Sequence, residues 1–165
     1  MALIGVPTDI GAGKRGASMG PEALRVAGID KALSRLGRGV VDRGNVVGPR
    51  NPENPRCGDY RHLPEVAAWC RGVHDAVYES LAAGEIPLTM GGDHSAAIGS
   101  VAAIARYCAE QDQPLAMLWL DAHADFNVAS SSEASRGFSR ASSPRWPASS
   151  SRRCTHASTP ATSRR

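Results

Sequence analysis

Short apolar runs alternate along this chain with longer segments in which apolar residues recur every three or four positions. The short runs are typical of buried strands, and they cover residues 2–6, 40–41, 86–90 and 115–120. The longer segments are typical of amphipathic helices, and they cover residues 21–37, 64–84 and 98–108. Pro21 and Pro64 support two of these helix starts, because proline fits the first turn of a helix.

This alternation of strands and helices predicts an α/β fold. Right-handed crossovers between successive strands give a parallel sheet covered by helices on both faces, which is a three-layer α/β/α arrangement. In such sheets ligands bind beyond the carboxyl ends of the strands. Polar clusters follow the runs 86–90 and 115–120, so we expect a binding site at that edge of the sheet.

The end of the chain differs from the rest in composition. Residues 129–165 contain twelve Ser, seven Arg and one acid, Glu133, for a net charge of +6, so the overall +3 leaves −3 on residues 1–128. A segment of this composition cannot bury enough apolar surface to fold. We therefore divide the chain into a domain at residues 1–127 and an unrelated Ser/Arg-rich tail at residues 128–165, which we expect to be disordered.

The composition disfavours several functional classes. The 165 residues are 42% hydrophobic and 21% charged, which is typical of one soluble domain, and no run of about 18 apolar residues could cross a membrane. The excess positive charge lies in a tail without a fold to present it, so we expect no nucleic-acid partner.

The spacing of the four cysteines fits neither a zinc site nor a dense disulfide framework, and the apolar run at residues 2–6 leaves no room for a signal peptide. We expect a cytoplasmic protein with reduced cysteines.

A glycine-rich loop occupies residues 7–20. Its segment Gly11-Ala12-Gly13-Lys14-Arg15-Gly16 matches the dinucleotide-binding fingerprint, and Asp42 could bind a ribose. Against this, the helix is predicted to begin only at Pro21, whereas the fingerprint needs its glycines at the helix N-terminus. A Walker loop also fails, because Arg15 stands where Ser or Thr should follow the lysine. We favour a structural or substrate-shaping loop and keep a dinucleotide-binding module as an alternative.

Three potential metal ligands come directly after the apolar run 115–120. In an extended segment alternate side chains point to the same side, so Asp121, His123 and Asp125 are expected to converge. Two carboxylates and an imidazole on one side of the chain outline a metal site.

A fourth potential ligand, His94, follows two glycines in the turn after the run 86–90. The topology places it at the same sheet edge, although a helix-capping turn made by Asp93 or Ser95 would leave His94 incidental. Oxygen and nitrogen ligands without a thiolate suit Mn²⁺ better than a closed structural zinc. Several carboxylates can also bridge two ions, which activate a bound water as hydroxide near neutral pH.

Two motifs and the start of the chain resemble the ureohydrolases. The motifs are Gly91-Gly92-Asp93-His94-Ser95 and Asp121-Ala122-His123-Ala124-Asp125-Phe126-Asn127. The asparagine that ends the second motif is similar to arginases rather than agmatinases. The opening also resembles arginases, in Ile4-Gly5-Val6-Pro7, Arg15-Gly16, Gly20-Pro21-Glu22 and Leu24-Arg25. The resemblance covers residues 2–127 in a consistent order.

The resemblance implies an arginase-like fold and a hydrolase of linear amidines. His94, Asp121, His123 and Asp125 would hold a binuclear Mn²⁺ centre, whose bridging hydroxide attacks the guanidinium carbon of L-arginine. The products would be L-ornithine and urea, which implies a role in arginine metabolism and the urea cycle. Asp125 would also act as a catalytic residue that passes a proton to the departing amine, and Asn127 would bind the α-carboxylate of the substrate. A homo-oligomer, as in the family, stays open for this chain.

After Asn127 the sequence departs from the family. The family continues with a second Asp-x-Asp metal pair and further substrate loops, whereas Glu133 is the only acid after Asp125 here. We therefore expect a truncated arginase that holds metal weakly and lacks activity. The alternatives are an agmatinase or other guanidino hydrolase, and a non-catalytic metal-binding fragment. Our hypothesis for the tail is a frameshift near Asn127, which predicts an open reading frame downstream that encodes Asp-x-Asp.

Overall fold

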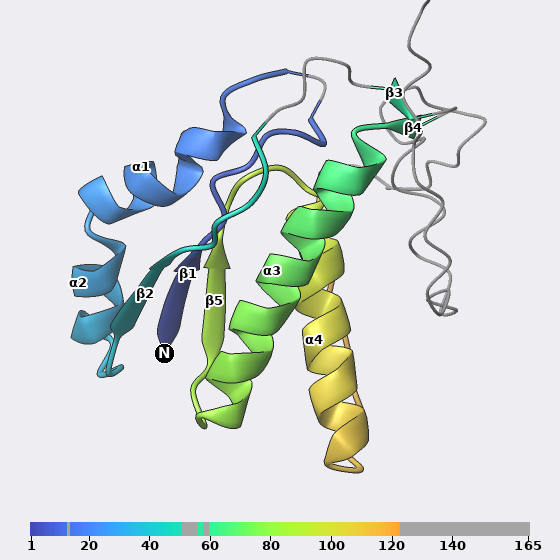
Figure 1. Cartoon of the computed structure of the whole chain (residues 1–165). Helices are drawn as coiled ribbons and strands as arrows, with labels where there is room; N and C mark the ends of the chain where they lie inside the picture. The colour runs from blue at the N-terminus through green and yellow to red at the C-terminus, as the bar shows by residue number, and fades with distance from the viewer. Residues whose placement is uncertain (13, 51–55, 58–59, 123–165) are drawn as a thin grey trace, which may run out of the picture.

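A three-stranded parallel sheet forms the centre of the computed structural model, which describes residues 1–12, 14–50, 56–57 and 60–122 (Figure 1). Strand β1 (Ala2–Gly5) lies between β2 (Val41–Asn45) and β5 (Pro87–Met90). Ala2 is in register with Val41 on one side and with Pro87 on the other. The apolar run at the start of the chain therefore forms the central strand, and all four of its residues are buried.

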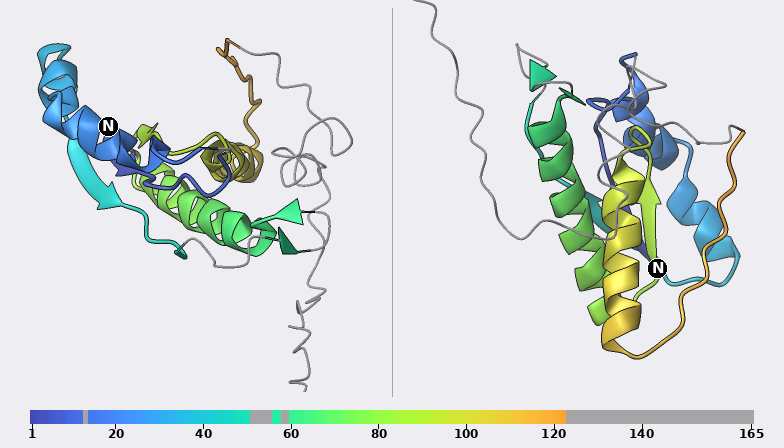
Figure 2. Two further views of the ribbon diagram at one scale, coloured as in Figure 1. Left: turned by 90° about the horizontal axis from the view of Figure 1, so that it is seen from above. Right: turned by 90° about the vertical axis from the view of Figure 1, so that its right-hand side faces the viewer.

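Helices cover both faces of this sheet, which confirms the predicted α/β fold (Figure 2). Helices α1 (Gly20–Val26) and α2 (Ile29–Arg35) lie on one side. Helices α3 (Leu63–Ala82) and α4 (Ala96–Glu110) lie on the other side, packed closely against each other. The remaining elements are a 3₁₀ turn η1 (Ala17–Met19) and a small antiparallel pair, β3 (Arg56–Cys57) with β4 (Tyr60–Arg61).

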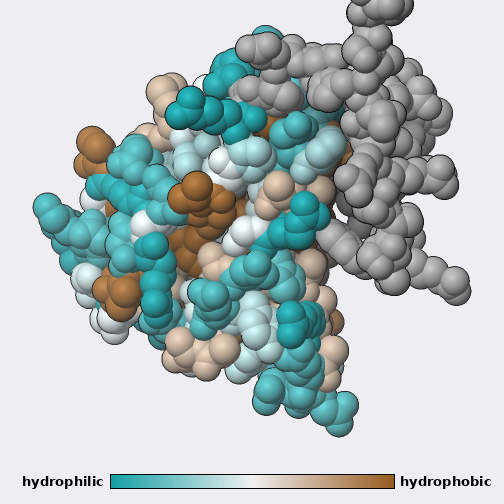
Figure 3. All heavy atoms as spheres, in the orientation of Figure 1, coloured by the Kyte–Doolittle hydropathy of each residue, from teal (hydrophilic) through white to brown (hydrophobic). Residues whose placement is uncertain are grey.

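Helix α3 shows how the apolar pattern becomes the core. Pro64 lies in its first turn, and Gly84, just beyond its end, has a φ of 73° that an L side chain would rarely adopt. Its apolar stripe packs on the sheet, and the resulting cluster includes Ile4, Val6, Val66, Trp69, Val73 and Val77. The face shown in Figure 3 is mostly hydrophilic, with separate hydrophobic patches. None of the described helices is long and apolar enough to span a bilayer.

The predicted helix over residues 21–37 is two helices. The backbone of Gly28 has a φ of 80°, a left-handed conformation that separates α1 from α2. The apolar spacing continues across this break, and both short helices lie on the same side of the sheet. The periodicity alone therefore could not reveal the break, although the glycine in its middle is a recognised interruption signal.

The prediction of a fourth strand at residues 115–120 is wrong. This segment has no regular secondary structure, and Leu118 and Leu120 are 83% and 86% exposed. An apolar run forms a buried strand only where a neighbouring strand and a covering layer are available. Within the described ranges β5 pairs with β1 alone, and the segment, orange in Figure 2, lies apart from the sheet.

Candidate metal centre

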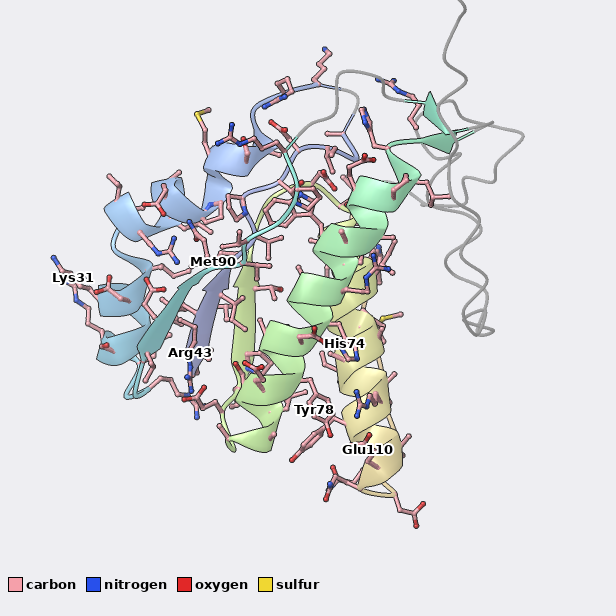
Figure 4. All side chains as sticks on the ribbon, viewed as in Figure 1. Lys31, Arg43, His74, Tyr78, Met90 and Glu110 are labelled. Carbon is pink, nitrogen blue, oxygen red and sulfur yellow. The ribbon has the colours of Figure 1, made fainter. Side chains whose placement is uncertain are left out.

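The turn between β5 and α4 requires two backbones to come very close. Met90 ends β5 and is labelled in Figure 4, and the Gly-Gly-Asp-His-Ser turn begins directly after it. A Cβ on Gly92 would lie 2.3 Å from the carbonyl oxygen of Val6 and 2.7 Å from that of Thr8. Only glycine fits there, so the second glycine of the motif allows the turn to pack on the loop that follows β1.

Asp93 connects that loop to the start of α4. Its backbone N–H donates to the carbonyl of Thr8 at 2.8 Å. Its carboxylate accepts from the N–H of Gly11 at 2.8 Å and from the N–H of Ser95 at 2.9 Å, and the Ser95 hydroxyl donates to it as well. This one side chain therefore holds two segments that are about eighty residues apart in the sequence.

The capping alternative for this turn is correct in part. Ser95 is the N-cap of α4, but its side chain makes no capping hydrogen bond. Asp93 instead accepts from the N–H two residues ahead, which is an Asx turn. Such a turn does not make His94 incidental, because it fixes the backbone on either side of that residue.

His94 and Asp121 come together at this edge. The Nδ1 atom of His94 lies 3.6 Å from a carboxylate oxygen of Asp121, and its ring centroid lies 5.2 Å from that of Trp119 at an angle of 58°. The His94 side chain is 47% exposed and the Asp121 side chain 19%. The structure thus brings together two of the four predicted ligands, from segments that the sequence pattern placed at one edge.

The other predicted site residues, His123, Asp125 and Asn127, lie outside the described residues. Over the part of the chain that is described, no group of three or more His, Cys, Asp or Glu side chains could hold a metal ion. The described portion of the site is therefore the pair His94 and Asp121, with Trp119 beside it.

Asp9 organises the glycine-rich loop that lines the same edge. This buried carboxylate accepts from the N–H of Gly16 at 2.9 Å, from the hydroxyl of Ser18 at 3.1 Å and from Arg15 Nε at 3.1 Å. Burial alone would raise the pKa of Asp9, but these hydrogen bonds and the charge of Arg15 outweigh it and lower the pKa below its usual value. The loop is built around its own carboxylate, as expected for a structural loop.

Sequence reasoning missed Asp9, and it considered Asp93 only as a cap. An acidic residue beside glycines in a loop is a sequence signal for both roles, because such loops leave backbone N–H groups that need acceptors. Cys70 is a further contact beneath the site, since its thiol donates to the carbonyl of Ser95 at 3.3 Å. Burial raises the pKa of this thiol to about 11, so it stays protonated and serves packing.

Comparison with known proteins assigns this fold and its motifs to one family. Residues 1–158 match the model of the Arginase family. The chain belongs to this family. It is similar to the arginase of Brevibacillus brevis, 35% identical over 132 residues that cover 80% of this chain and 43% of that protein. The arginase of Brucella melitensis is 38% identical over 128 residues, which cover 76% of this chain and 41% of that protein.

A solved structure supports the same assignment. The native arginase of Bacillus caldovelox at pH 5.6 superposes with a TM-score of 0.70 at 38% identity, over 79% of this chain and 43% of that chain. This confirms the resemblance and the arginase-like α/β fold that the motifs implied.

The chain spans less than half the length of the arginases it matches. The alignments with the two bacterial arginases cover 132 and 128 residues, whereas the family model reaches residue 158. The boundary that we predict at residue 127 therefore stays a prediction.

Proposed function

We propose that this chain carries the N-terminal part of an arginase-type site, which hydrolyses L-arginine to L-ornithine and urea. The observation that carries the proposal is the meeting of His94 and Asp121 at the carboxyl edge of the parallel sheet, 3.6 Å apart. Their two motifs are separated by a whole helix, α4, and only the fold brings them together. The arginases of the relatives named above support the choice of substrate.

The donor set of this pair fits a divalent metal such as Mn²⁺. One imidazole nitrogen and one carboxylate, without a thiolate, are ligands for hard or borderline cations. We propose His94, Asp121, His123 and Asp125 as the ligands that this chain contributes to a binuclear centre. When bound, such a centre lowers the pKa of water and so supplies a nucleophile for the weakly electrophilic guanidinium carbon.

The protein side chains would do the rest of the chemistry. We propose that Asp125 passes a proton to the departing amine and that Asn127 binds the α-carboxylate of the substrate. The indole ring of Trp119 packs at an angle against the imidazole ring of His94 and so limits the orientations of that imidazole. A fixed imidazole favours metal binding, because less freedom is lost when the ion arrives.

For the chain of 165 residues by itself, we propose that it binds metal but does not hydrolyse the substrate. Glu133 is the only acidic residue after Asp125, so residues 126–165 offer no second Asp-x-Asp pair. An agmatinase or another guanidino hydrolase is the alternative within the same class, and a non-catalytic metal-binding fragment is the other. We also propose a cytoplasmic location, in keeping with the free thiols of Cys70 and Cys108.

Two histidine variants test the metal site. His94→Ala removes a proposed ligand, whereas His74→Ala removes a histidine of α3 that pairs with Asp75 at 2.9 Å on the surface. Mn²⁺ titration should give an affinity lower by more than about tenfold for His94→Ala and an unchanged affinity for His74→Ala. Equal affinities for the two variants would contradict the proposed centre.

A urea assay separates the functional alternatives. The protein with Mn²⁺ is offered arginine and agmatine in parallel, and we expect metal binding without urea release from either. Urea from arginine would show that the chain of 165 residues completes the catalytic site by itself, for example by self-association. Urea from agmatine alone would replace arginine with agmatine as the proposed substrate.

A further inference from the structure

We infer that Asp93 is a positioning residue, whose carboxylate fixes the backbone around His94 and so directs the imidazole toward Asp121. The inference rests on the proposed function, because it concerns how the first metal ligand is presented. It assigns to the acid of the Gly-Gly-Asp-His-Ser motif a task other than binding metal.

The contacts of Asp93 point into the protein. One carboxylate oxygen accepts from Gly11 N–H at 2.8 Å, and the other accepts from both the N–H and the hydroxyl of Ser95. Ser95 is buried, and a Cβ on Gly11 would lie 2.9 Å from the Asp93 carboxylate. The carboxylate therefore lies, partly buried, between the two segments it joins.

The same contacts restrain His94 from both sides. Before it, Asp93 N–H is bonded to Thr8; after it, Ser95 N–H is bonded back to the Asp93 side chain. The carbonyl of His94 accepts from Ala97 N–H at 3.1 Å, in the first turn of α4. With its backbone held in this way, His94 places its Nδ1 atom 3.6 Å from a carboxylate oxygen of Asp121. Rigid support of this kind is what a preorganised metal ligand needs.

Asp9 provides a matched control within the same loop. Like Asp93, it is a carboxylate that accepts hydrogen bonds from a backbone N–H and a serine hydroxyl, and it is itself buried. Its bonds, however, go to residues 15–18 of its own loop rather than to the turn that carries His94. Loss of Asp9 should therefore loosen residues 15–18, while Thr8 and Gly11 keep their hydrogen bonds to Asp93.

The test compares Asp93→Asn with Asp9→Asn in the full chain. Asparagine keeps the shape of the side chain but turns one acceptor into a donor, which would face the N–H of Gly11 or of Ser95. With Mn²⁺ alone as the probe, followed by the electron paramagnetic resonance of the free ion, the dissociation constant should rise about 10- to 100-fold for Asp93→Asn. For Asp9→Asn it should stay close to that of the unsubstituted protein.

A second readout does not depend on metal. Nuclear Overhauser contacts between the His94 ring and the Trp119 indole should weaken in Asp93→Asn and persist in Asp9→Asn. If the unsubstituted protein binds no Mn²⁺, the proposed function fails, while these contacts still decide the role of Asp93. Contacts and affinity that are equal in the two variants would overturn the inference.

A milder variant covers the case in which Asp93→Asn does not fold. Ser95→Ala removes the hydroxyl that donates to Asp93 and leaves both backbone N–H donors in place. For Ser95→Ala we expect a smaller loss of Mn²⁺ affinity than for Asp93→Asn, and a partial weakening of the contacts between His94 and Trp119. No change in either measurement for a folded Ser95→Ala protein would count against the inference.

Discussion

The two sides of the candidate metal centre are held in different ways. His94 follows β5, whose last residue Met90 is buried, and the residues around it are bonded to the loop after β1 and to the first turn of α4. Asp121 follows residues 115–120, which have no regular structure and expose their large apolar side chains. One proposed ligand is thus built into the sheet edge, and the other approaches it from an irregular segment.

This difference shows what fixes a ligand in an α/β fold. All residues of β1, and Met90 of β5, are buried because neighbouring strands and α3 cover them. Residues 115–120 have similar composition but, in the described chain, no strand beside them. The apolar character of a segment therefore supplies a driving force for burial, and the neighbours decide whether that force produces a strand.

The largest effect expected from this comparison is on stability. Leu3→Ala should lower the free energy of unfolding by about 3 kcal/mol, because Leu3 is fully buried in β1 and its loss leaves a cavity. Leu118→Ala, the same change in the exposed segment, should alter it by less than about 0.5 kcal/mol. Chemical denaturation followed by circular dichroism measures both. A large cost for Leu118→Ala would show that the segment is packed in solution.

A pair of glycine variants tests the close contact beneath His94. Gly92→Ala should cost about 2 kcal/mol, because its Cβ would meet the backbone oxygens of Val6 and Thr8 and the turn would have to move. Gly91→Ala should cost less than about 1 kcal/mol, since a Cβ there has open space around it. The same denaturation experiment compares them. Equal costs would mean that the turn does not pack on the loop as described.

Much of the fold could be predicted from the sequence, because its elements are periodic and clearly bounded. The apolar stripe from Val66 to Val77 predicted α3, and the run at residues 86–90 predicted β5, which spans Pro87–Met90. His94 and Asp121 could be placed together since parallel strands share a carboxyl edge. The structure does bring these two side chains within 3.6 Å of each other, although the second segment is not a strand, and their role as metal ligands stays a prediction.

The remaining features of the fold and of the candidate site depend on contacts that the spacing of apolar residues does not encode. The break at Gly28 and the exposure of residues 115–120 depend on which elements lie nearby in space. The roles of Asp9 and Asp93 depend on backbone donors in a loop, and Gly11 is remote in sequence from the turn it bonds. A pattern of residue types identifies which groups could act, and packing decides which partners they find.

The smallest effect expected concerns Asp9, whose pKa is lowered in the folded protein. The usual pKa of this carboxyl, near 3.8, applies to the unfolded chain, and its pKa in the folded protein is lower. Above pH 3.8 the ionised carboxylate therefore stabilises the fold. This contribution is lost as the pH falls from 3.8 through the pKa of the folded protein. Asp9→Asn should therefore cost about 1 kcal/mol at pH 7, and the difference from the unsubstituted protein should shrink below about pH 4. Asp30→Asn, at an exposed position of α2, controls for the change in net charge. A difference for Asp9→Asn that stays constant from pH 7 to pH 3 would mean that the loop does not depend on the ionised carboxylate.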